Sequence, residues 1–124
     1  MLNHFINDAE HIYLALGATD FRKQIHSLVA LVQLSFGKNP FEEAAVFLFC
    51  NKRKDSIKVL RFDRNGFVLA QKKLLEEMKF RWPKEEGDLK QISSKQVAWL
   101  LQGLEITQKY AHTELKKEGK NYCF

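Results

Sequence analysis

The sequence has few of the residues that build disulfide frameworks, metal sites or membrane spans. Its 124 residues include two cysteines, Cys50 and Cys123, two prolines and four histidines. Two isolated cysteines are typical of incidental thiols in a reducing compartment, although a single disulfide between them is compatible with the sequence. No histidine pair has zinc-ligand spacing. No apolar run approaches the ~18–20 residues that span a bilayer, and the acidic N-terminus is unlike a signal peptide. We therefore expect a cytoplasmic protein without metal, cofactor or membrane contact.

Motifs of catalysis are equally scarce. Gly66 and Gly103 stand alone, so there is no glycine-rich phosphate loop, and no nucleophile–base arrangement is visible. Asp20, Asp55 and Asp63 could converge on a metal ion, as in a nuclease. Asp55 and Asp63, however, lie in polar segments between apolar runs, where aspartate is a common turn residue. We therefore expect no catalytic residues, and a nuclease is the weaker alternative.

The apolar pattern predicts one α+β domain over residues 1–106, followed by a polar C-terminal tail over 107–124. Thr19 is a candidate helix cap, and an apolar stripe of helical spacing over 20–36 predicts the first helix. Ser93 and Gln96 form a capping-box pattern that begins the second helix. Runs of apolar residues and of alternating polarity predict strands over 12–16, 46–50, 57–62, 67–73, 78–82 and 89–92.

These elements predict an antiparallel sheet of about five strands packed with two α-helices. The run 46–50 is apolar at every position, which is typical of a central strand covered on both faces. Asn65-Gly66 between two strand-like runs predicts a tight hairpin turn, because both residues tolerate positive φ.

Positive charge is concentrated in one part of the chain. Residues 50–84 contain eleven Lys or Arg and four Asp or Glu, a net charge of +7, whereas the whole chain has a net charge of +5. Such clustering is a footprint of nucleic-acid binding, because basic side chains that contact phosphates release counterions. For the turn and strand residues, the alternative is a solvated sheet edge rich in lysine. For Arg22 and Lys23, the alternative is an ion pair with an acid from another element. The candidate phosphate contacts are Arg22, Lys23, Lys52, Arg53, Lys54, Lys58 and Arg64, which basic residues at 61, 72, 73, 79 and 81 could extend.

Aromatic residues offer a second set of candidates. Phe62, Phe67, Phe80 and Trp82 could stack on nucleic-acid bases, but aromatic residues in a small domain are more often core. Trp99 lies off the apolar stripe of the second helix, so it is a candidate contact for a protein partner.

Several blocks of sequence resemble one known family in the same order and at compatible spacing. Residues 19–23 (TDFRK) resemble its TDMRK signature, and residues 47–67 resemble its run FxFxNRRRDxIKxLxWDxxGF. Residues 80–83 (FRWP) and 100–104 (LLQGL) resemble its FxWP and LLxGI blocks. The family comprises the TnpB, or second-open-reading-frame, proteins of the insertion-sequence-66 transposons, and the likeness covers about residues 10–106.

The resemblance implies an accessory role in transposition beside a larger transposase, which would carry the catalytic acids. The expected partners are transposon DNA and the transposase of the same element. Our first hypothesis is a non-catalytic protein that contacts DNA through its basic surface. The alternative is an interaction module that docks on the transposase, with Trp99 as an anchor, and makes no direct DNA contact.

Overall fold

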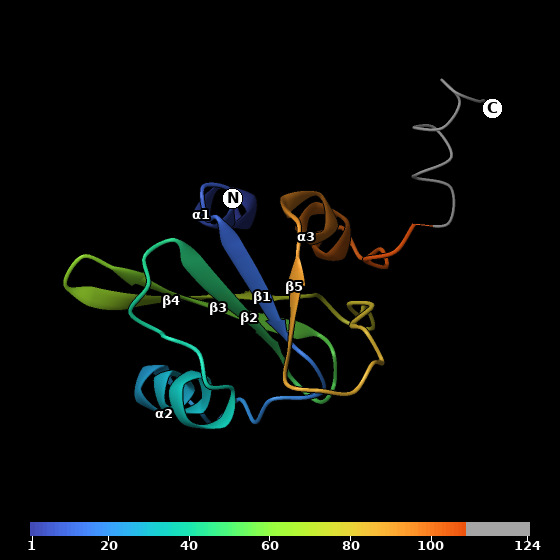
Figure 1. The fold of residues 1–124 in the computed structure, drawn as a ribbon. Helices are drawn as coiled ribbons and strands as arrows, with labels where there is room; N and C mark the ends of the chain where they lie inside the picture. Colours follow the sequence, from blue (N-terminus) through green and yellow to red (C-terminus); the bar gives the residue numbers. More distant parts are fainter. Residues whose placement is uncertain (109–124) are drawn as a thin grey trace, which may run out of the picture.

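A five-stranded sheet lies between two layers of helices in the computed structural model, which describes residues 1–108 (Figure 1). In Figure 1, α1 and α3 lie above the sheet and α2 lies below it. In chain order the elements are α1 (Leu2–Ile6), β1 (His11–Ala15), α2 (Ile25–Ala30), the π-helical η1 (Leu31–Ser35), β2 (Ala45–Cys50), β3 (Ser56–Asp63), β4 (Gly66–Lys73), β5 (Leu89–Ile92) and α3 (Ser94–Leu101).

The strand order is β4-β3-β2-β1-β5, so β4 and β5 form the two edges. Every neighbouring pair is antiparallel except β1 and β2, which are parallel. Parallel neighbours need a long crossover, which α2 and η1 supply across one face of the sheet. The predicted α+β class is confirmed, and the parallel pair is the departure from a purely antiparallel sheet.

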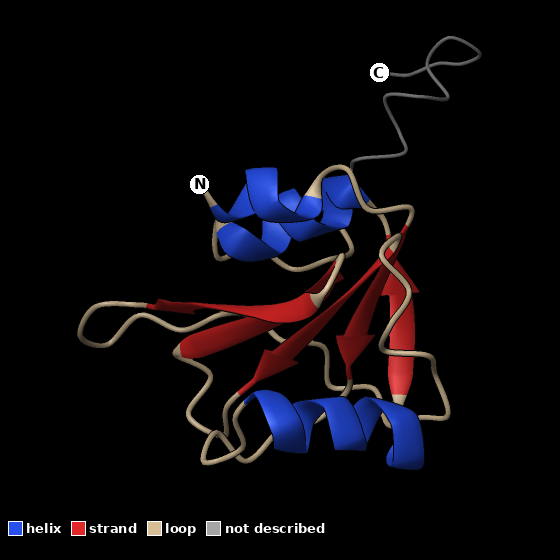
Figure 2. Ribbon diagram, turned by 90° about the vertical axis from the view of Figure 1, so that its left-hand side faces the viewer, coloured by secondary structure: helices blue, strands red, loops and turns tan. Residues whose placement is uncertain are grey.

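Helices lie on both sides of the sheet, as Figure 2 shows, and both faces of the sheet are buried. One apolar cluster joins the sheet to α1 and α3, and a second joins it to α2 and η1. All six residues of β2 are buried. The prediction of a central strand covered on both faces is therefore confirmed, and a strand of this kind fixes the positions of both helical layers.

The first long helix begins later than predicted. Gln24 is its N-cap, and α2 starts one residue further on. Thr19 does not cap the helix: it is buried, and its backbone N–H donates to Cys50 O at 2.8 Å. This bond ties the chain to the end of β2, so residues 19–23 form a turn before the helix. The predicted apolar stripe is confirmed, since Leu28 and Val32 are fully buried.

The predicted strand over 78–82 is wrong in its pairing. The segment is extended but joins no ladder, and it lies against the end of the sheet. Phe80 N donates to Lys54 O at 2.7 Å, and Trp82 Nε1 donates to Ala15 O at 2.9 Å. Burial alternates over residues 79–82, where Phe80 and Trp82 are buried without strand pairing, but the predicted pattern fails at Met78, which is 57% exposed.

The second predicted helix is confirmed as α3, with its capping box. The Ser93 hydroxyl accepts from Gln96 N at 3.1 Å, and Ser93 N donates to the Gln96 side chain at 2.9 Å. Helix α1 was not predicted, because its five residues are too short to show a period. The predicted tail over 107–124 lies outside the described residues from position 109 onward.

We predict that Trp82→Phe lowers the free energy of unfolding by about 1–3 kcal/mol, the usual effect of leaving a buried hydrogen-bonding group unpaired. The change removes the donor to Ala15 O while keeping an aromatic ring in the core. Urea unfolding followed by circular dichroism measures the loss. Trp99→Phe, at a half-buried site, is the matched control, and an equal loss in both variants would contradict the prediction.

Candidate nucleic-acid interface

Most of the predicted basic residues gather at one end of the sheet. Strands β1 and β2 end there, and the turn 51–55 leads into β3. Lys52, Arg53 and Lys54 are exposed on this turn. Lys73, at the end of β4, lies at the same end because it pairs with Ser56. We call this group the basic end, and its residues are Arg22, Lys23, Lys52, Arg53, Lys54, Lys73, Lys79 and Lys84.

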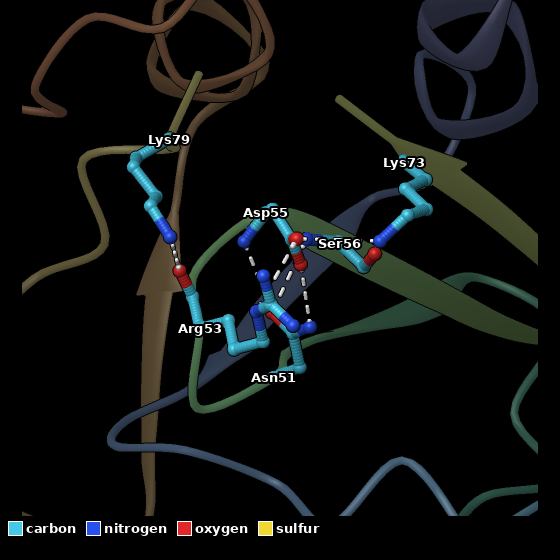
Figure 3. A network of polar contacts seen from close by, with 6 residues as sticks. All are labelled: Asn51, Arg53, Asp55, Ser56, Lys73 and Lys79. Atoms are coloured by element: carbon cyan, nitrogen blue, oxygen red, sulfur yellow. Dashed lines mark hydrogen bonds and ion pairs between the residues drawn. The ribbon is translucent and has the colours of Figure 1, made fainter. Parts of the chain in front are cut away.

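A buried aspartate organises the turn of the basic end (Figure 3). Asp55 Oδ1 accepts from Asn51 Nδ2 at 2.7 Å, and Asp55 Oδ2 lies 3.2 Å from Lys73 Nζ and 3.9 Å from Arg53 Nε. Asn51 Oδ1 in turn accepts from the backbone N–H groups of Asp55 and Ser56. The Asn51 hydrogen bond, with help from Lys73 and Arg53, lowers the pKa of Asp55 to about 2. The interpretation of Asp55 as a turn residue is confirmed.

The extended segment after β4 supports the same turn from the outside. Lys79 Nζ donates to Arg53 O at 2.8 Å (Figure 3). The neighbouring Phe80 N donates to Lys54 O. Lys54 has a φ of 62°, a left-handed conformation that is uncommon for lysine. The backbone of the turn is thus bonded on both sides, and its basic side chains project into solvent.

Lys58 is not part of the exposed surface, and this corrects the sequence-based assignment. Its residue is only 3% exposed, and its ammonium donates to Phe21 O at 3.0 Å and to Lys23 O at 2.9 Å. The ammonium also lies 4.7 Å from the centre of the Phe21 ring, and burial lowers its pKa. Lys58 therefore holds the segment between β1 and α2 against the sheet, and no phosphate can reach it in this conformation.

Arg22 and Lys23 lie on that held segment, ahead of the helix and not in its first turn. The Arg22 side chain is 91% exposed and pairs with Asp20, with Nη2 and Oδ2 2.7 Å apart. The hydrogen bonds from Arg22 lower the pKa of Asp20 to about 2. The alternative predicted for Arg22 is an ion pair with an acid from another element, whereas the pair that forms is local, with an acid two residues away on the same segment. An ion pair this exposed contributes little free energy, so a phosphate can compete with Asp20 for the guanidinium of Arg22.

Arg64 lies at the opposite end of the sheet, in the hairpin between β3 and β4. The eight residues of β3 separate it from the basic end, roughly 24 Å at the usual rise per strand residue. The hairpin has the predicted position, but Arg64 itself takes the positive φ of 56°, and neither Asn65 nor Gly66 does. Arg64 N donates to Glu43 Oε2, so an acid lies beside it. The structure does not bring Arg64 together with the other candidates.

The aromatic candidates fall into two groups. Phe80 and Trp82 lie in the core, which is the more common position for aromatic residues in a small domain. Phe62 and Phe67 are partly buried and pack with the half-exposed Phe41, at ring-centre distances of 5.1 to 5.4 Å. This cluster lies at the hairpin end of β3, away from the basic end. Base stacking by Phe62 or Phe67 stays a prediction.

Two adjoining grooves run beside the basic end, with volumes of about 670 and 380 Å³. Both are lined by Lys54, Trp82 and Lys84. The sequence analysis did not identify Lys84 as a candidate, because the neighbouring sequence does not show that Trp82 brings the chain back to the turn 51–55. The one indication in the sequence is that Lys84 ends the basic stretch 50–84.

The part of the chain that the structure describes holds no cluster of metal ligands. Within residues 1–108, no group of three His, Cys, Asp or Glu side chains is placed to hold a metal ion. No helix in this range is long and apolar enough to cross a membrane. Cys50 is a buried free thiol, and burial raises its pKa to about 12, so it is a poor nucleophile. Cys123 lies outside the described residues.

Comparison with known proteins identifies the family. The model of the IS66 Orf2-like proteins matches residues 10–111. The chain belongs to the IS66 Orf2-like family. It is also similar to two uncharacterized proteins of Sinorhizobium fredii: y4hO is 33% identical over 94 residues, and y4jC is 31% identical over 97. These matches cover 76% and 78% of this chain and 80% and 81% of the relatives. No solved structure matches significantly. Membership of the family associates the chain with an accessory role in transposition.

We predict that Asp55→Asn destabilises the protein in a pH-dependent way. A folded pKa of about 2, below the ordinary 3.8, means that the carboxylate stabilises the fold above its unfolded pKa and loses that effect as pH falls toward 2. The difference in unfolding free energy between wild type and variant should therefore be largest near neutral pH and shrink in acid. Denaturant unfolding at several pH values measures it.

Asn51→Ala serves as a companion variant, because it removes the largest cause of the lowered pKa. It should destabilise the protein and weaken the pH dependence while leaving Asp55 in place. If the difference in unfolding free energy between wild type and Asp55→Asn stayed constant from neutral pH into acid, the assigned role of the carboxylate would be contradicted.

Proposed function

We propose that this chain is a non-catalytic accessory protein of transposition that binds the backbone of duplex DNA through its basic end, with strand-transfer chemistry supplied by the transposase. The observation that carries the proposal is the convergence of exposed Arg22, Lys52, Arg53 and Lys54 on one sheet end. Three internal contacts present this surface: the Asp55 network, the Lys58 clamp and the Lys79 bond. A positively charged surface on a rigid scaffold matches the regular phosphates of a duplex.

Duplex backbone is favoured over single-stranded DNA because of where the aromatic rings lie. Single-strand binding surfaces combine basic grooves with exposed rings on which bases stack. Beside the basic end, Phe80 and Trp82 are buried, and the Lys58 ammonium covers part of Phe21. The contacts available there are with phosphates, which carry no sequence information directly. We therefore expect weak sequence preference from this surface.

We predict that the triple variant Lys52→Ala/Arg53→Ala/Lys54→Ala loses most of its affinity for duplex fragments of the element's ends. The slope of log K against log salt should fall by about 0.9 for each phosphate that the variant no longer neutralises. Fluorescence anisotropy over a series of salt concentrations measures both quantities. Undetectable binding by the wild type at low salt would contradict the proposal.

Arg64→Ala is the matched control, because it removes an exposed positive charge at the opposite end of the sheet. It should leave the salt slope unchanged. If Arg64→Ala lowers the affinity for duplex DNA by as much per charge as the triple variant does, the affinity depends on the net charge of the protein and not on the basic end. An oligothymidine competitor that displaces the duplex at equal phosphate concentration would contradict the preference for duplex.

The alternative function, docking on the transposase through Trp99, is supported by one observation. Trp99 is half-buried on α3, and the Lys95 ammonium lies 5.5 Å from its ring centre, so an aromatic face stays close to the surface. Half-exposed tryptophan is typical of protein interfaces. If docking is the function, co-purification with the transposase should be lost in Trp99→Ala and retained in the triple lysine–arginine variant. The reverse pattern would favour DNA contact.

A further inference from the structure

Strand β4 is an edge strand with little of the usual protection against pairing. It is paired along all eight of its residues with β3, and its other side has no strand within residues 1–108. Residues 66–71 contain no charge and no proline. Edge strands are normally protected by lysine, proline or bulges along their length, and here Lys72 and Lys73 stand only at one end. The strand is therefore open to a pairing partner.

The free hydrogen-bonding groups of β4 can be assigned from the ladder. Leu74 N donates to Asp55 O at 2.8 Å, which places Leu74 at a position bonded to β3. Since antiparallel bonding alternates along a strand, the even-numbered residues of β4 point their backbone groups toward β3. Phe67, Leu69 and Gln71 then point their N–H and C=O groups outward from the sheet.

A cleft of about 640 Å³ opens beside this edge, on the face covered by α1 and α3. Its walls are mostly apolar, and Leu2, Phe5, Val68, Ala70 and Leu101 contribute to them. Val68 is 39% exposed. The cleft is also lined by Asn3, whose Oδ1 is buried without a hydrogen-bond partner among the described residues. An apolar cleft with an unpaired acceptor next to an open strand edge has the features of a strand-addition site.

We propose that the occupant is a second copy of this chain, bound through antiparallel pairing of the two β4 edges across a two-fold axis at Leu69. In this register, residues whose numbers add to 138 face each other. Outward-bonding Phe67 lies opposite Gln71, and Val68 lies opposite Ala70 at the rim of the cleft. Ten strands then form one continuous sheet. The pairing is self-complementary, as a two-fold interface requires.

Charge distribution favours this antiparallel orientation over a parallel one. Lys72 of each copy lies opposite Gly66 of the other, which Asp63 flanks on β3. The lysine end of each strand therefore meets the hairpin end of the second copy, where the exposed Asp63 and Arg64 carry charges of both signs. A parallel arrangement in register would put Lys72 and Lys73 of both copies side by side, and like charges directly opposite each other are destabilising.

The test is the molar mass of the full chain in solution, measured by analytical ultracentrifugation over a concentration series without DNA. The wild type should approach twice the 14.5 kDa of one chain as concentration rises. Gln71→Pro removes an outward N–H without breaking the β3 ladder, and by symmetry it removes two bonds. It should raise the dimer dissociation constant roughly 30-fold, as expected for two hydrogen bonds of ordinary strength.

Gln71→Thr keeps the N–H and is the matched control, with wild-type mass expected. Val68→Lys is a second disrupting variant, since it places a charge at the rim of the cleft while sparing the backbone; Val68→Thr is its control.

Circular dichroism establishes that each variant is folded. If Gln71→Pro is not folded, the mass of Val68→Lys decides whether the proposal holds. A wild type that stays monomeric at every concentration overturns the proposal, as does a dimer that folded Gln71→Pro or Val68→Lys leaves intact. Because DNA is absent, the result is independent of the proposed DNA contact.

Discussion

The burial of β2 on both faces is the constraint on which the rest of the structure depends. Its six side chains point alternately to the two sides of the sheet, and none of them reaches solvent. Each face must therefore be covered, by α1 and α3 on one side and by α2 with η1 on the other. The faces are then occupied by core packing, so polar chemistry is left to the two ends of the sheet and to its edges. The basic residues consequently gather where strands turn.

At one of these ends, the chain holds its positive charge in place through contacts that are themselves polar. Asp55 is buried beside Arg53 and Lys73, and its negative charge reduces their mutual repulsion. Lys58 satisfies two carbonyl oxygens of the segment that carries Arg22. Lys79 satisfies a third carbonyl, on the turn itself. Several lysines of the basic stretch thus act as donors to the backbone, and only some of them remain available to a ligand.

This division explains what the sequence could predict. Features set by local pattern were found: β2, the β3–β4 hairpin, the capping box of α3 and the turn role of Asp55. Features set by contacts across the chain were not. Lys58 looks like any strand lysine until the loop from β1 covers it, 35 residues away from Lys23 in sequence. The strand predicted over 78–82 has the right alternation only from residue 79 onward, and pairing depends on a free neighbour, so its backbone bonds the turn instead.

The two sheet ends also differ in a way that relates the proposed DNA contact to the proposed dimer. The hairpin end mixes charges, since Asp8 pairs with Arg61 and Glu43 contacts Arg64 N, whereas the other end is predominantly basic. A strand that is basic at one end and mixed in charge at the other favours an antiparallel copy of itself over a parallel one. That pairing would put the two basic ends at opposite extremes of one continuous sheet. Such a dimer could not lay both surfaces on the same short stretch of duplex, so it would suit two separate DNA segments better than one.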